Sequence, residues 1–554
     1  MNSSVGVDNS KKGLFVQAGI LAIAGIISRI IGLLYGSPLA AIIGDEGNGY
    51  YAAAYAVYTI VLLVSSYSIP SAMSKIIAGK LAVKEYRNAH RIFRCALIYV
   101  AVVGGIGSLV LFFAAPVFVT GRSATVLRFF APTIFLFGFL GVLRGYFQAH
   151  RTMIPTSLSQ LIEQIFNAIV SIGGALILTR IAGDEDPVKR AVYGAIGSAV
   201  GTGSGVLVAL IFMFLVYRYN RPRVKESLEK DTHEDMANGE IIKMIFLIVT
   251  PFILSTCIYN LSTFLNSTLF SRILFHYKGI DESVIAYQYG IFARKAMVIT
   301  NLPIAMASAA AAAMIPEVST TYARGDVEQA GVTVSRVTRV ILMISIPCAV
   351  GLFALARPVM MILFPQKRSL DEAAFLLMLL AITVVFYSLS TVTNAVLQGI
   401  GKVNAPVLNA ALALILQSGL LSFLLIYTNL GYVALCIVTI LYSLVMCILN
   451  NLVMKRNLPI VNDFKKTYLF PSIASIVMGA AAFGIYKLFE FVFGLFMGSP
   501  YFINLFSTLI SVFFAAFIYF AVLIKSGGAS EDDIKRFPKG NSIVSLLNVN
   551  FHDN

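Results

Sequence analysis

Long apolar runs separated by short polar segments dominate the chain from residue 13 to residue 525. Each run reaches the roughly 20 residues that an α-helix needs to cross the hydrocarbon core of a bilayer. We predict membrane spans at 13–38, 50–79, 93–119, 126–148, 157–180, 191–217, 241–271, 284–316, 335–363, 372–397, 406–427, 431–454, 467–494 and 501–524. The pattern therefore predicts an all-α polytopic membrane protein with about 14 transmembrane helices. An even number of spans puts both termini on the same side.

The apolar pattern carries the same short motifs twice. Each half has a proline inside a span and, later, a glutamine near a helix end that is followed by a second proline. The two sets are Ile69–Met73, Leu143–Gln148 and Pro155 in the first half, and Leu302–Met306, Val396–Gly399 and Pro406 in the second. The chain therefore reads as two copies of one helical unit. Such duplication is typical of transporters, which bind cargo between two lobes and alternate the side from which it is reached.

The repeat predicts how the chain is organised. Residues 1–218 form a first lobe of six spans around a central cavity, and residues 219–240, the most charged stretch, form a cytoplasmic linker. Residues 241–455 form the second lobe of six spans. The two spans in residues 456–525 have no counterpart in the repeat and form an appendix, and residues 526–554 form a polar tail.

Composition and charge agree with a membrane protein and give its orientation. Hydrophobic residues make up 58% of the chain, charged residues only 12%, and the mean hydropathy is +0.83. Lys and Arg number 42 against 27 Asp and Glu, a net charge of +15. With the N-terminus inside, most of the Lys and Arg fall on the cytoplasmic side, as the positive-inside rule requires. Topology and anionic lipid head groups account for this charge, so we expect cytoplasmic termini and no nucleic-acid partner.

The sequence lacks the signatures of an enzyme or a metalloprotein. Its five cysteines lie inside apolar runs without a C-x-x-C pair, and its histidines are not clustered, so no disulfide or metal site is expected. The phosphate-binding pattern G-x-x-x-x-G-K-[ST] is absent. The outer loops, such as Gly183–Asp186, are too short to form an enzymatic domain. We expect no catalytic residue and no cofactor.

Charged residues inside spans are the candidate functional groups, because a central charge costs about 2.5–3.5 kcal/mol on insertion scales. Arg29 lies near the middle of the first span and is expected to face a cavity, with an acidic partner such as Glu163 or alone. For Lys75, near the inner end of the second span, a functional role and snorkelling to the interface stay open. Arg294 and Lys295 are adjacent in the eighth span and point about 100° apart. We expect one of them to face inward and the other to snorkel.

Glu163 and two polar stripes complete the candidate set. Glu163, in the fifth span, has three possible roles: counter-ion of Arg29, proton carrier or cation ligand. The stripes are Thr256, Asn260, Thr263 and Ser267 in the seventh span, and Tyr387, Thr391, Asn394 and Gln398 in the tenth. Each stripe lies on one helix face and either lines a central cavity or packs in a dry interface. Asn260 and Asn394 are the candidate substrate contacts on them.

These basic groups indicate the chemistry of the cargo. In a dry, concave site Arg and Lys favour phosphate or carboxylate, and the forked donors of arginine suit phosphate best. An exporter of cationic drugs would instead need acidic and aromatic groups, because basic residues repel its substrate. The sequence therefore predicts an anionic cargo.

At this point the sequence resembles a known family. Ser28–Gly32 in the first span, Ile69–Lys75 in the second, the duplicated glutamine-then-proline joints and the span number are similar to the MurJ-type lipid II flippases, in particular their stage V sporulation protein B branch. This family belongs to the multidrug/oligosaccharidyl-lipid/polysaccharide (MOP) exporter superfamily. The resemblance covers residues 13 to 525 and implies a multi-pass protein of the bacterial plasma membrane.

The resemblance also implies a mechanism of alternating access. Cavity arginines hold the pyrophosphate and sugars of a lipid-linked precursor, while its polyprenyl tail stays in the bilayer or in a groove beside the last two helices. Arg29 matches the family's first-span arginine and Lys75 its basic position late in the second span, whereas Arg294 and Lys295 match the eighth-span basic residue only roughly. Tyr35 and Gly36 stand where the well-studied branch has a further arginine and an acid. The cavity is therefore expected to be less basic.

The function that these observations predict is a flippase for a polyprenyl-pyrophosphate-linked cell-wall precursor, with lipid II as the favoured cargo. Its expected partners are that substrate, membrane lipids and cell-wall synthesis proteins. The alternatives are a flippase for another lipid-linked oligosaccharide and a cation-coupled small-molecule exporter of the same superfamily. A membrane-embedded glycosyl-transfer enzyme would need acidic or histidine clusters on an outer loop. The acidic outer loops here, Gly183–Asp186 and Asp281–Glu282, are short, and we interpret them as solvated turns.

Overall fold

The computed structural model describes residues 3–67, 69–229, 231–460 and 463–528, so most of the predicted tail at 526–554 lies outside the described residues. Every regular element in these ranges is helical. Contacts divide the chain into two compact units, Met1–Gly290 and Ile291–Asn554. Each unit is described here by itself.

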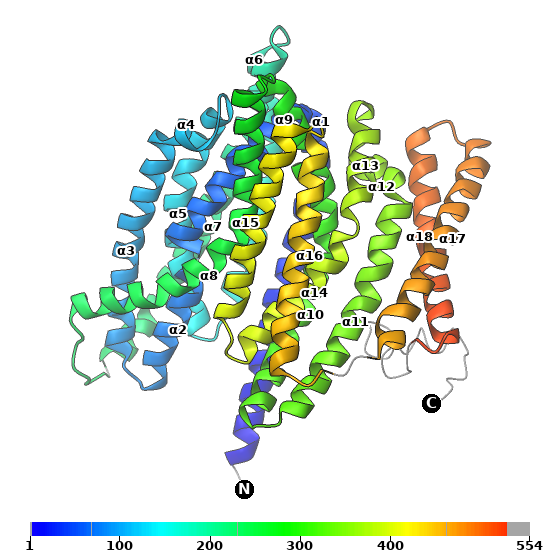
Figure 1. The fold of residues 1–554 in the computed structure, drawn as a ribbon. Coiled ribbons are helices and arrows are strands. Elements are labelled where there is room, and N and C mark those ends of the chain that lie inside the picture. The colour runs from blue at the N-terminus through cyan, green and yellow to red at the C-terminus, as the bar shows by residue number, and fades with distance from the viewer. Residues whose placement is uncertain (1–2, 68, 230, 461–462, 529–554) are drawn as a thin grey trace. The chain divides into compact units, whose positions relative to one another are not determined.

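The described residues of unit 1 form nine α-helices and two short π-helices, and the α-helices are labelled in Figure 1. Its elements are α1 (Ser3–Leu62), the π-helix η1 (Leu63–Tyr67), α2 (Ile69–Ala82), α3 (Tyr86–Phe113), α4 (Ala115–Phe118), α5 (Ser123–Ala149), α6 (Ile154–Ala182), α7 (Pro187–Glu229), α8 (Asn238–Arg272), the π-helix η2 (Ile273–Tyr277) and α9 (Glu282–Gly290). The long helix α1 breaks at Gly44, whose φ of 69° and ψ of 179° a residue with a Cβ rarely adopts. The first predicted span and the start of the second therefore share one kinked helix.

Unit 2 begins in the middle of a predicted span. Its elements are the π-helix η3 (Ile291–Ala296), α10 (Met297–Ala323), α11 (Val327–Ala354), α12 (Ala356–Leu363), the 3₁₀ helix η4 (Lys367–Ser369), α13 (Leu370–Leu380), α14 (Thr383–Gly399), α15 (Asn404–Tyr427), α16 (Tyr432–Asn457), the π-helix η5 (Lys465–Leu469), α17 (Phe470–Gly494) and α18 (Pro500–Lys525). The segments Lys367–Leu380 and Thr383–Gly399 meet at a bend of 43° and are together long and apolar enough to cross a membrane.

The packing of the two units repeats. In unit 1, α2 and α3 pack on α5, and α5 and α6 pack on α7, with α3, α5 and α7 visible in Figure 1. In unit 2, α10 and α11 pack on α14, and α14 and α15 pack on α16. A π-helical segment also precedes each repeated proline: η1 lies before Pro70 and η3 lies before Pro303. Proline has no N–H to donate within a helix, so local rearrangement near it is expected. The duplicated motifs of the sequence thus correspond to duplicated helix packing.

Glycines explain how closely some of these helices approach. The helices α6 and α7 pack tightly where Gly174 faces Gly197, because a Cβ at Gly197 would lie 2.4 Å from the Gly174 backbone. Four residues further along α7, a Cβ at Gly201 would collide with Ser171 in the same way. Small residues at this spacing allow membrane helices to pack backbone against backbone.

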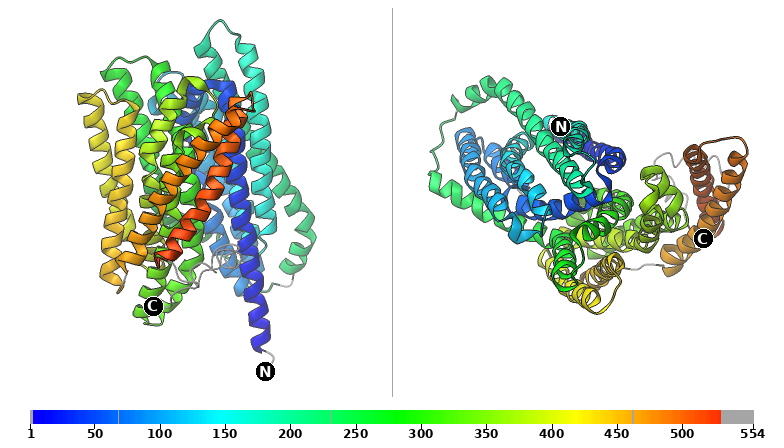
Figure 2. Two further views of the ribbon diagram at one scale, coloured as in Figure 1. Left: turned by 90° about the vertical axis from the view of Figure 1, so that its right-hand side faces the viewer. Right: turned by 90° about the horizontal axis from the view of Figure 1, so that it is seen from above.

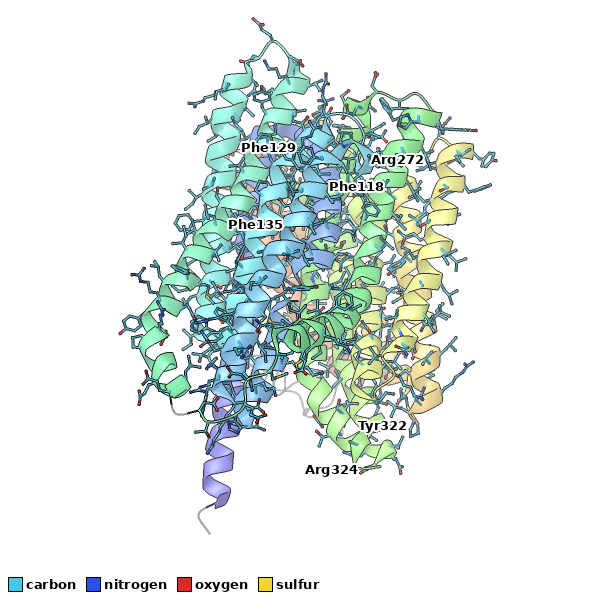
Figure 3. All side chains as sticks on the ribbon, turned by 90° about the vertical axis from the view of Figure 1, so that its left-hand side faces the viewer. Phe118, Phe129, Phe135, Arg272, Tyr322 and Arg324 are labelled. Carbon is cyan, nitrogen blue, oxygen red and sulfur yellow. The ribbon has the colours of Figure 1, made fainter. Side chains whose placement is uncertain are left out.

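The described part of the chain has ten helices that are long and apolar enough to cross a membrane, or eleven if the bent pair counts as one span. The polytopic helical class is therefore correct, whereas the count of fourteen is not confirmed. One reason is that Ile23–Ala82, which contains most of the first two predicted spans, counts once. Another is that α8 and the helices between Glu282 and Ala323 are not among the ten. Large apolar side chains such as Phe129 and Phe135 point outward from α5 (Figure 3), and they are 45% and 38% exposed. Such faces suit lipid contact.

The predicted linker is partly helical and is bound to unit 1. The helix α7 continues to Glu229, and the segment after it contacts the start of α3. The backbone N–H of Arg87 donates to the Asp231 carboxylate at 2.6 Å, and Asn88 donates to the Glu234 carbonyl at 2.9 Å and accepts from the Met236 N–H at 2.9 Å. Because α8 and α9 also pack on α1, the compact unit extends to Gly290. The lobe boundary at 219–240 stays a prediction.

The last two helices dock on unit 2 through buried hydrogen bonds. The helices α17 and α18 form an antiparallel hairpin, in orange and red in Figure 2, and α17 packs on α11. Asn504 donates to the Pro358 carbonyl at 3.0 Å, and the Tyr519 hydroxyl donates to the Met343 carbonyl at 2.8 Å. Two hydrogen bonds from different positions along α18 therefore attach the hairpin to the rest of unit 2.

Candidate functional site

Arg29 lies on an open face of α1. Its side chain is exposed, and no ion pair among the described residues involves it. The large apolar side chains that α1 exposes, Ile23, Ile26, Ile27, Ile30 and Leu34, form one stripe. At 100° per residue, Arg29 lies about 120° round the helix from the middle of that stripe. Its face is shared by Gly25 and Gly36, where an added Cβ would meet no atom within 4 Å. Arg29 therefore lies on an exposed face of α1 away from the apolar stripe, and its role as a cavity residue stays a prediction.

Glu163 has a different partner from the one considered in the sequence analysis. Its Oε2 accepts from Nη2 of Arg144 on α5 at 2.7 Å, and Arg144 Nε donates to Ser159 Oγ at 2.9 Å. The Arg144 side chain is 8% exposed and that of Glu163 is 25% exposed. The pairing with Arg29 is therefore wrong for this structure. Arg29 and Glu163 still lie on adjoining helices, because an added Cβ on Gly32 would lie 3.2 Å from Nε2 of Gln164.

Polar contacts continue along α6 beyond the ion pair. Asn167 donates to the Tyr35 hydroxyl at 3.4 Å, and Ser171 donates to Asn167 at 2.9 Å. Tyr35 is the residue that stands where the resembling family has an arginine. The network thus joins α1 to α6 through neutral groups. A site of this kind holds its charges fixed and carries less positive charge than the resemblance alone implies.

Lys75 and Asn260 also belong to unit 1. Lys75 is exposed on α2, and the described part of the chain gives it no ion pair. Asn260, on α8, is partly exposed, and Thr263 after it is exposed. Ser267, at the end of the same stripe, is only 1% exposed. This stripe therefore changes from an open face to a packed one along α8.

The adjacent residues Arg294 and Lys295 have different surroundings in unit 2. Lys295 is 1% exposed, donates to Ser369 Oγ at 2.7 Å and lies 5.8 Å from the centre of the Phe364 ring. Arg294 is partly exposed. Both belong to the π-helix η3, and such segments are frequent at functional sites. In this conformation Arg294 is the residue of the pair that a ligand can reach.

Asn394 takes the place in unit 2 that Arg144 takes in unit 1, since each lies four residues before the repeated glutamine. It is partly exposed on α14 and accepts a hydrogen bond from Gln398 at 3.0 Å. Thr391 in the same stripe donates to the Tyr387 carbonyl at 2.7 Å. The charged pair of the first copy is thus replaced by neutral amides in the second copy.

Sequence reasoning missed the pairing of Arg144 with Glu163. Its signal was available, because α5 and α6 are consecutive spans joined by a short loop and each carries one buried charge of opposite sign. Antiparallel neighbours with a short loop bring such positions to similar depth. Side-chain direction could not be read from the sequence, since the choice between Arg29 and Arg144 depends on how α1 packs on α6.

Unit 2 contains an apolar pocket of about 800 Å³ between α11, α13 and α17. It is lined by residues such as Val350 and Phe353 of α11, Ile382 after α13, and Ala480 and Phe483 of α17. Its wall contains no charged side chain. A site of this kind can hold a hydrocarbon chain but offers nothing to a polar ligand.

No group of three or more His, Cys, Asp or Glu side chains in the described residues could hold a metal ion. The arrangement instead offers exposed cations on open helix faces, a fixed ion pair and a separate apolar groove. Exposed cations can bind an anionic group, and an apolar groove can hold a hydrocarbon chain.

Comparisons with known proteins agree with this description. Residues 15–322 match the sequence profile of the family described as "Polysaccharide biosynthesis protein", and residues 251–424 match that of MatE. Two curated proteins of Bacillus subtilis (strain 168) are similar to the chain. "Lipid II flippase MurJ" is 23% identical over 77% of this chain and 81% of that protein, and "Stage V sporulation protein B" is 23% identical over 94% and 96%.

Solved structures share the fold. A structure described as "Lipid II flippase MurJ, inward closed conformation" aligns with a TM-score of 0.65 at 14% identity, over 91% of this chain and 98% of that one. An inward-facing multidrug resistance transporter of the MATE family aligns with a TM-score of 0.60 at 17% identity, over 80% of this chain and 97% of that one. At these identities the likeness concerns the fold alone.

Proposed function

The chain belongs to the polysaccharide biosynthesis protein family, within the MOP superfamily, and on that premise we propose that it is a flippase for a polyprenyl-pyrophosphate-linked cell-wall precursor. The observation that carries the proposal is the open, glycine-rich face of α1 around Arg29. A guanidinium there can donate two parallel hydrogen bonds to a phosphate. Lipid II is the favoured cargo, since one relative is named as a lipid II flippase.

The two parts of such a cargo need different surroundings. The pyrophosphate and sugars require polar groups, which Arg29, Lys75 and Arg294 offer on exposed or partly exposed faces. The polyprenyl tail requires an apolar surface, and the pocket between α11, α13 and α17 has that character. Its volume of about 800 Å³ accommodates several isoprene units, with the rest of the tail in lipid. We propose that the tail lies in this groove while the polar groups bind the head group as it crosses the membrane.

Alternating access of the two repeats, 1–218 and 241–455, is the proposed mechanism. Without a nucleotide-binding pattern in the sequence, the driving force comes from outside the protein. An inside-negative potential favours outward movement of an anion by about 2.3 kcal/mol per charge per 100 mV. We propose location in the bacterial plasma membrane with both termini in the cytoplasm, where the precursor is made.

Complementation tests this proposal in cells. The full-length protein is expressed in a bacterium whose own lipid II flippase can be depleted, and the lipid-linked precursor in each leaflet is measured. We expect the wild-type protein to restore precursor in the outer leaflet and Arg29→Ala to leave it in the inner leaflet. Arg190→Ala, which removes an exposed cation paired with Asp184, is the control and should behave as wild type. If neither the wild-type protein nor either variant restores precursor in the outer leaflet, the proposed cargo is contradicted.

A cation-coupled small-molecule exporter is the second candidate, because the MatE profile and a MATE-family structure match part of the chain. Such a transporter needs an acid that is available to a proton or metal ion. The carboxylate of Glu163 is already held by Arg144 at 2.7 Å, which disfavours that role. Drug efflux that depends on a proton or sodium gradient, with no change in precursor distribution, would favour the exporter.

A further inference from the structure

Besides the apolar pocket of unit 2, the structure has a polar pocket in unit 1. The proposed transport path does not use it. It lies at the end of the unit that carries the α2–α3 and α5–α6 loops and has a volume of about 240 Å³. Four helices, α2, α3, α5 and α7, contribute to its wall. The side chains that give the wall its polar character are Tyr86, His90, His150, Thr152 and Asn220. A pocket with several convergent polar groups is a candidate binding site.

The two histidines have ring nitrogens that the protein does not satisfy. Nε of Arg94 donates to Nε2 of His90 at 3.1 Å, so a neutral His90 carries its proton on Nδ1. That Nδ1 is buried and has no partner within the described residues. His150 donates from Nδ1 to the Tyr146 carbonyl at 2.9 Å, which leaves Nε2 on an exposed ring. Buried polar atoms without a partner are rare and call for a bound group.

Both loops beside the pocket hold a basic residue in a left-handed backbone conformation. Lys84 has a φ of 63° and Arg151 a φ of 57°, and they are the two non-glycine residues with positive φ in the described ranges. A side chain with a Cβ is strained there. Strained residues of this kind cluster at functional sites.

The second unit shows that the α5–α6 loop does not need a basic residue. The corresponding loop between α14 and α15 has Gly401, with a φ of 81°, at the position of Arg151. The residue that follows donates back to the helix in both loops: Thr152 to Phe147 at 3.1 Å, and Lys402 to Leu397 at 2.8 Å. This is the helix-ending motif in which glycine is the usual residue.

The α2–α3 loop shows the same substitution. Its counterpart between α10 and α11 has Gly325, with a φ of 82°, at the position of Lys84. The following N–H donates to the helix in each case: Glu85 to Lys80 at 3.0 Å, and Asp326 to Thr321 at 3.3 Å. Unit 1 therefore keeps a strained basic side chain in both loops where unit 2 has glycine.

The positive charge around the pocket is not neutralised by the acids nearby. Lys80 and Asn88 bind Glu85, the Arg87 N–H and His233 bind Asp231, and Arg91 binds Asp235. No ion pair within the described ranges involves Lys84, Arg94, Arg151 or Arg221. Three of these cations lie within two residues of the pocket wall along the chain: Lys84, Arg151 and Arg221. The fourth, Arg94, donates to His90, which with His150 belongs to that wall.

We propose that the pocket between α2, α3, α5 and α7 binds a phosphate group, with Lys84 and Arg151 at its rim and His90 and His150 in its wall. Phosphate takes several charge-assisted hydrogen bonds, and its charge offsets the cost of placing these cations together. This proposal explains why the two loops keep strained residues. Lys84 and Arg151 bring positive charge to the pocket, whereas glycine would relieve the strain but bring no charge. The phosphate belongs either to a soluble metabolite or to the head group of an anionic lipid.

The test uses the full-length protein and inorganic pyrophosphate as the probe. Binding is measured by equilibrium dialysis on detergent-purified wild type and on Lys84→Gly and Arg151→Gly, which install the residue that unit 2 has in the same loops. We expect affinity to fall about tenfold or more in each variant, while the melting temperature stays the same or rises because the strain is relieved. Affinity equal to that of the wild type in both variants, or no binding to the wild type, would overturn the proposal.

Matched controls separate this pocket from general basicity. Arg324→Ala and Lys402→Ala remove one cation beside each corresponding loop of unit 2; Arg324 lies at the end of α10 (Figure 3). Both variants should bind pyrophosphate as the wild type does. If they lose as much affinity as Lys84→Gly and Arg151→Gly, net charge alone explains the binding and the proposed site is overturned. His150→Phe keeps a ring beside Tyr146 but removes both nitrogens, and we expect it to weaken binding without unfolding the protein.

A second arm identifies the source of the phosphate. Pyrophosphate binding is compared in nanodiscs of zwitterionic phosphatidylcholine and in nanodiscs that also contain anionic phosphatidylglycerol. A soluble ligand predicts equal binding in both, and a lipid head group predicts that phosphatidylglycerol competes. In either case the binding must depend on Lys84 and Arg151, or the proposal fails.

Discussion

Arg29 shows how position on a helix decides the role of a single charge. It lies away from the apolar stripe of α1 and beside glycines that leave space around it. Nothing in the described parts of the chain pairs with it, so its charge is available to a ligand. Because an unpaired charge is costly in a membrane, we propose that Arg29 binds an anionic cargo.

We predict that Arg29→Ala abolishes flipping while the protein still inserts and accumulates. Arg29→Lys should restore activity only in part, because a lysine ammonium keeps the charge but loses the bidentate geometry. Flipping is measured as precursor reaching the outer leaflet, and protein level by immunoblot of membranes. If Arg29→Ala flips the precursor as fast as the wild type, Arg29 does not belong to the substrate-binding site.

The Arg144–Glu163 pair makes a different prediction, because both partners are largely withdrawn from water. Removing one partner leaves the other uncompensated, which typically costs about 3 kcal/mol. Arg144→Met should therefore unfold at a clearly lower temperature than the wild type, and the double change Arg144→Met with Glu163→Leu should recover part of the loss. Thermal unfolding of the purified protein measures this.

The same pair also predicts what Glu163→Gln does to transport. If Glu163 only balances Arg144, the variant changes stability and leaves the pH and cation dependence of flipping unaltered. A changed dependence on pH or sodium would mean that Glu163 couples transport to an ion, and would contradict the structural role.

At the scale of elements, the segment between α7 and α8 is held by Asp231, which is 3% exposed. Burial raises the pKa of Asp231, but hydrogen bonds from the Arg87 N–H and from His233 outweigh it and lower the pKa to about 2. A carboxylate whose folded pKa is depressed stabilises the fold above its unfolded pKa and loses this effect as the pH falls toward the folded value. The attachment should thus persist at pH 5 and weaken between about pH 4 and pH 2.

Hydrogen exchange tests this attachment. In the wild type at pH 7 we expect the Arg87 and His233 amides to be protected, and in Asp231→Asn to exchange faster. Asp235→Asn is the control, since Asp235 is 50% exposed and its pair with Arg91 is worth little. Equal exchange in wild type and Asp231→Asn would contradict the role of Asp231.

The apolar groove of unit 2 makes an element-scale prediction of its own. Ala480→Trp on α17 adds a large side chain to a pocket of about 800 Å³ and should obstruct a polyprenyl tail. We expect slower flipping of a long-chain precursor and a smaller effect on a short-chain analogue, both measured in proteoliposomes. Phe491→Trp, at a 68% exposed position of the same helix, is the control. If Ala480→Trp flips the long-chain and short-chain substrates at equal rates, the tail does not bind in this pocket.

Sequence reasoning recovered the elements better than their boundaries. The helical class and the duplicated packing follow from apolar length and from the repeated prolines, which depend on local physics. The continuous α1, the helical start of the predicted linker and the compact unit that ends at Gly290 depend on tertiary contacts. Those contacts leave no periodic signal in one sequence.

The surroundings of the candidate residues could be predicted only in part, for a similar reason, and their roles stay predictions. Charge inside a span indicated Arg29, Glu163, Arg294 and Lys295, but the sequence could not separate an open residue from a buried one. The structure makes Lys295 1% exposed and leaves Arg294 partly exposed. The direction of each side chain follows from the helix rotation within its unit, and the π-helical η3 changes that rotation locally.

At the scale of the whole molecule, the chain is a helical transporter with duplicated packing. We propose that its exposed cations bind a charged head group and that its apolar groove holds a lipid tail. Neither feature alone specifies a cargo, and the two together fit an amphipathic anion that is larger than a small drug. The central claim is therefore that the chain moves a polyprenyl-pyrophosphate-linked precursor between leaflets.

The most direct test is a leaflet assay in proteoliposomes that contain only the purified protein and a fluorescent polyprenyl-pyrophosphate-linked disaccharide. A membrane-impermeant quencher reports the fraction in the outer leaflet, with and without an imposed potential. We predict that the wild-type protein accelerates exchange, that a potential negative on the side of origin increases the rate, and that Arg29→Ala gives the rate of empty liposomes. Wild-type protein that leaves the precursor in its original leaflet, while it transports a small cation against a gradient, would contradict the account.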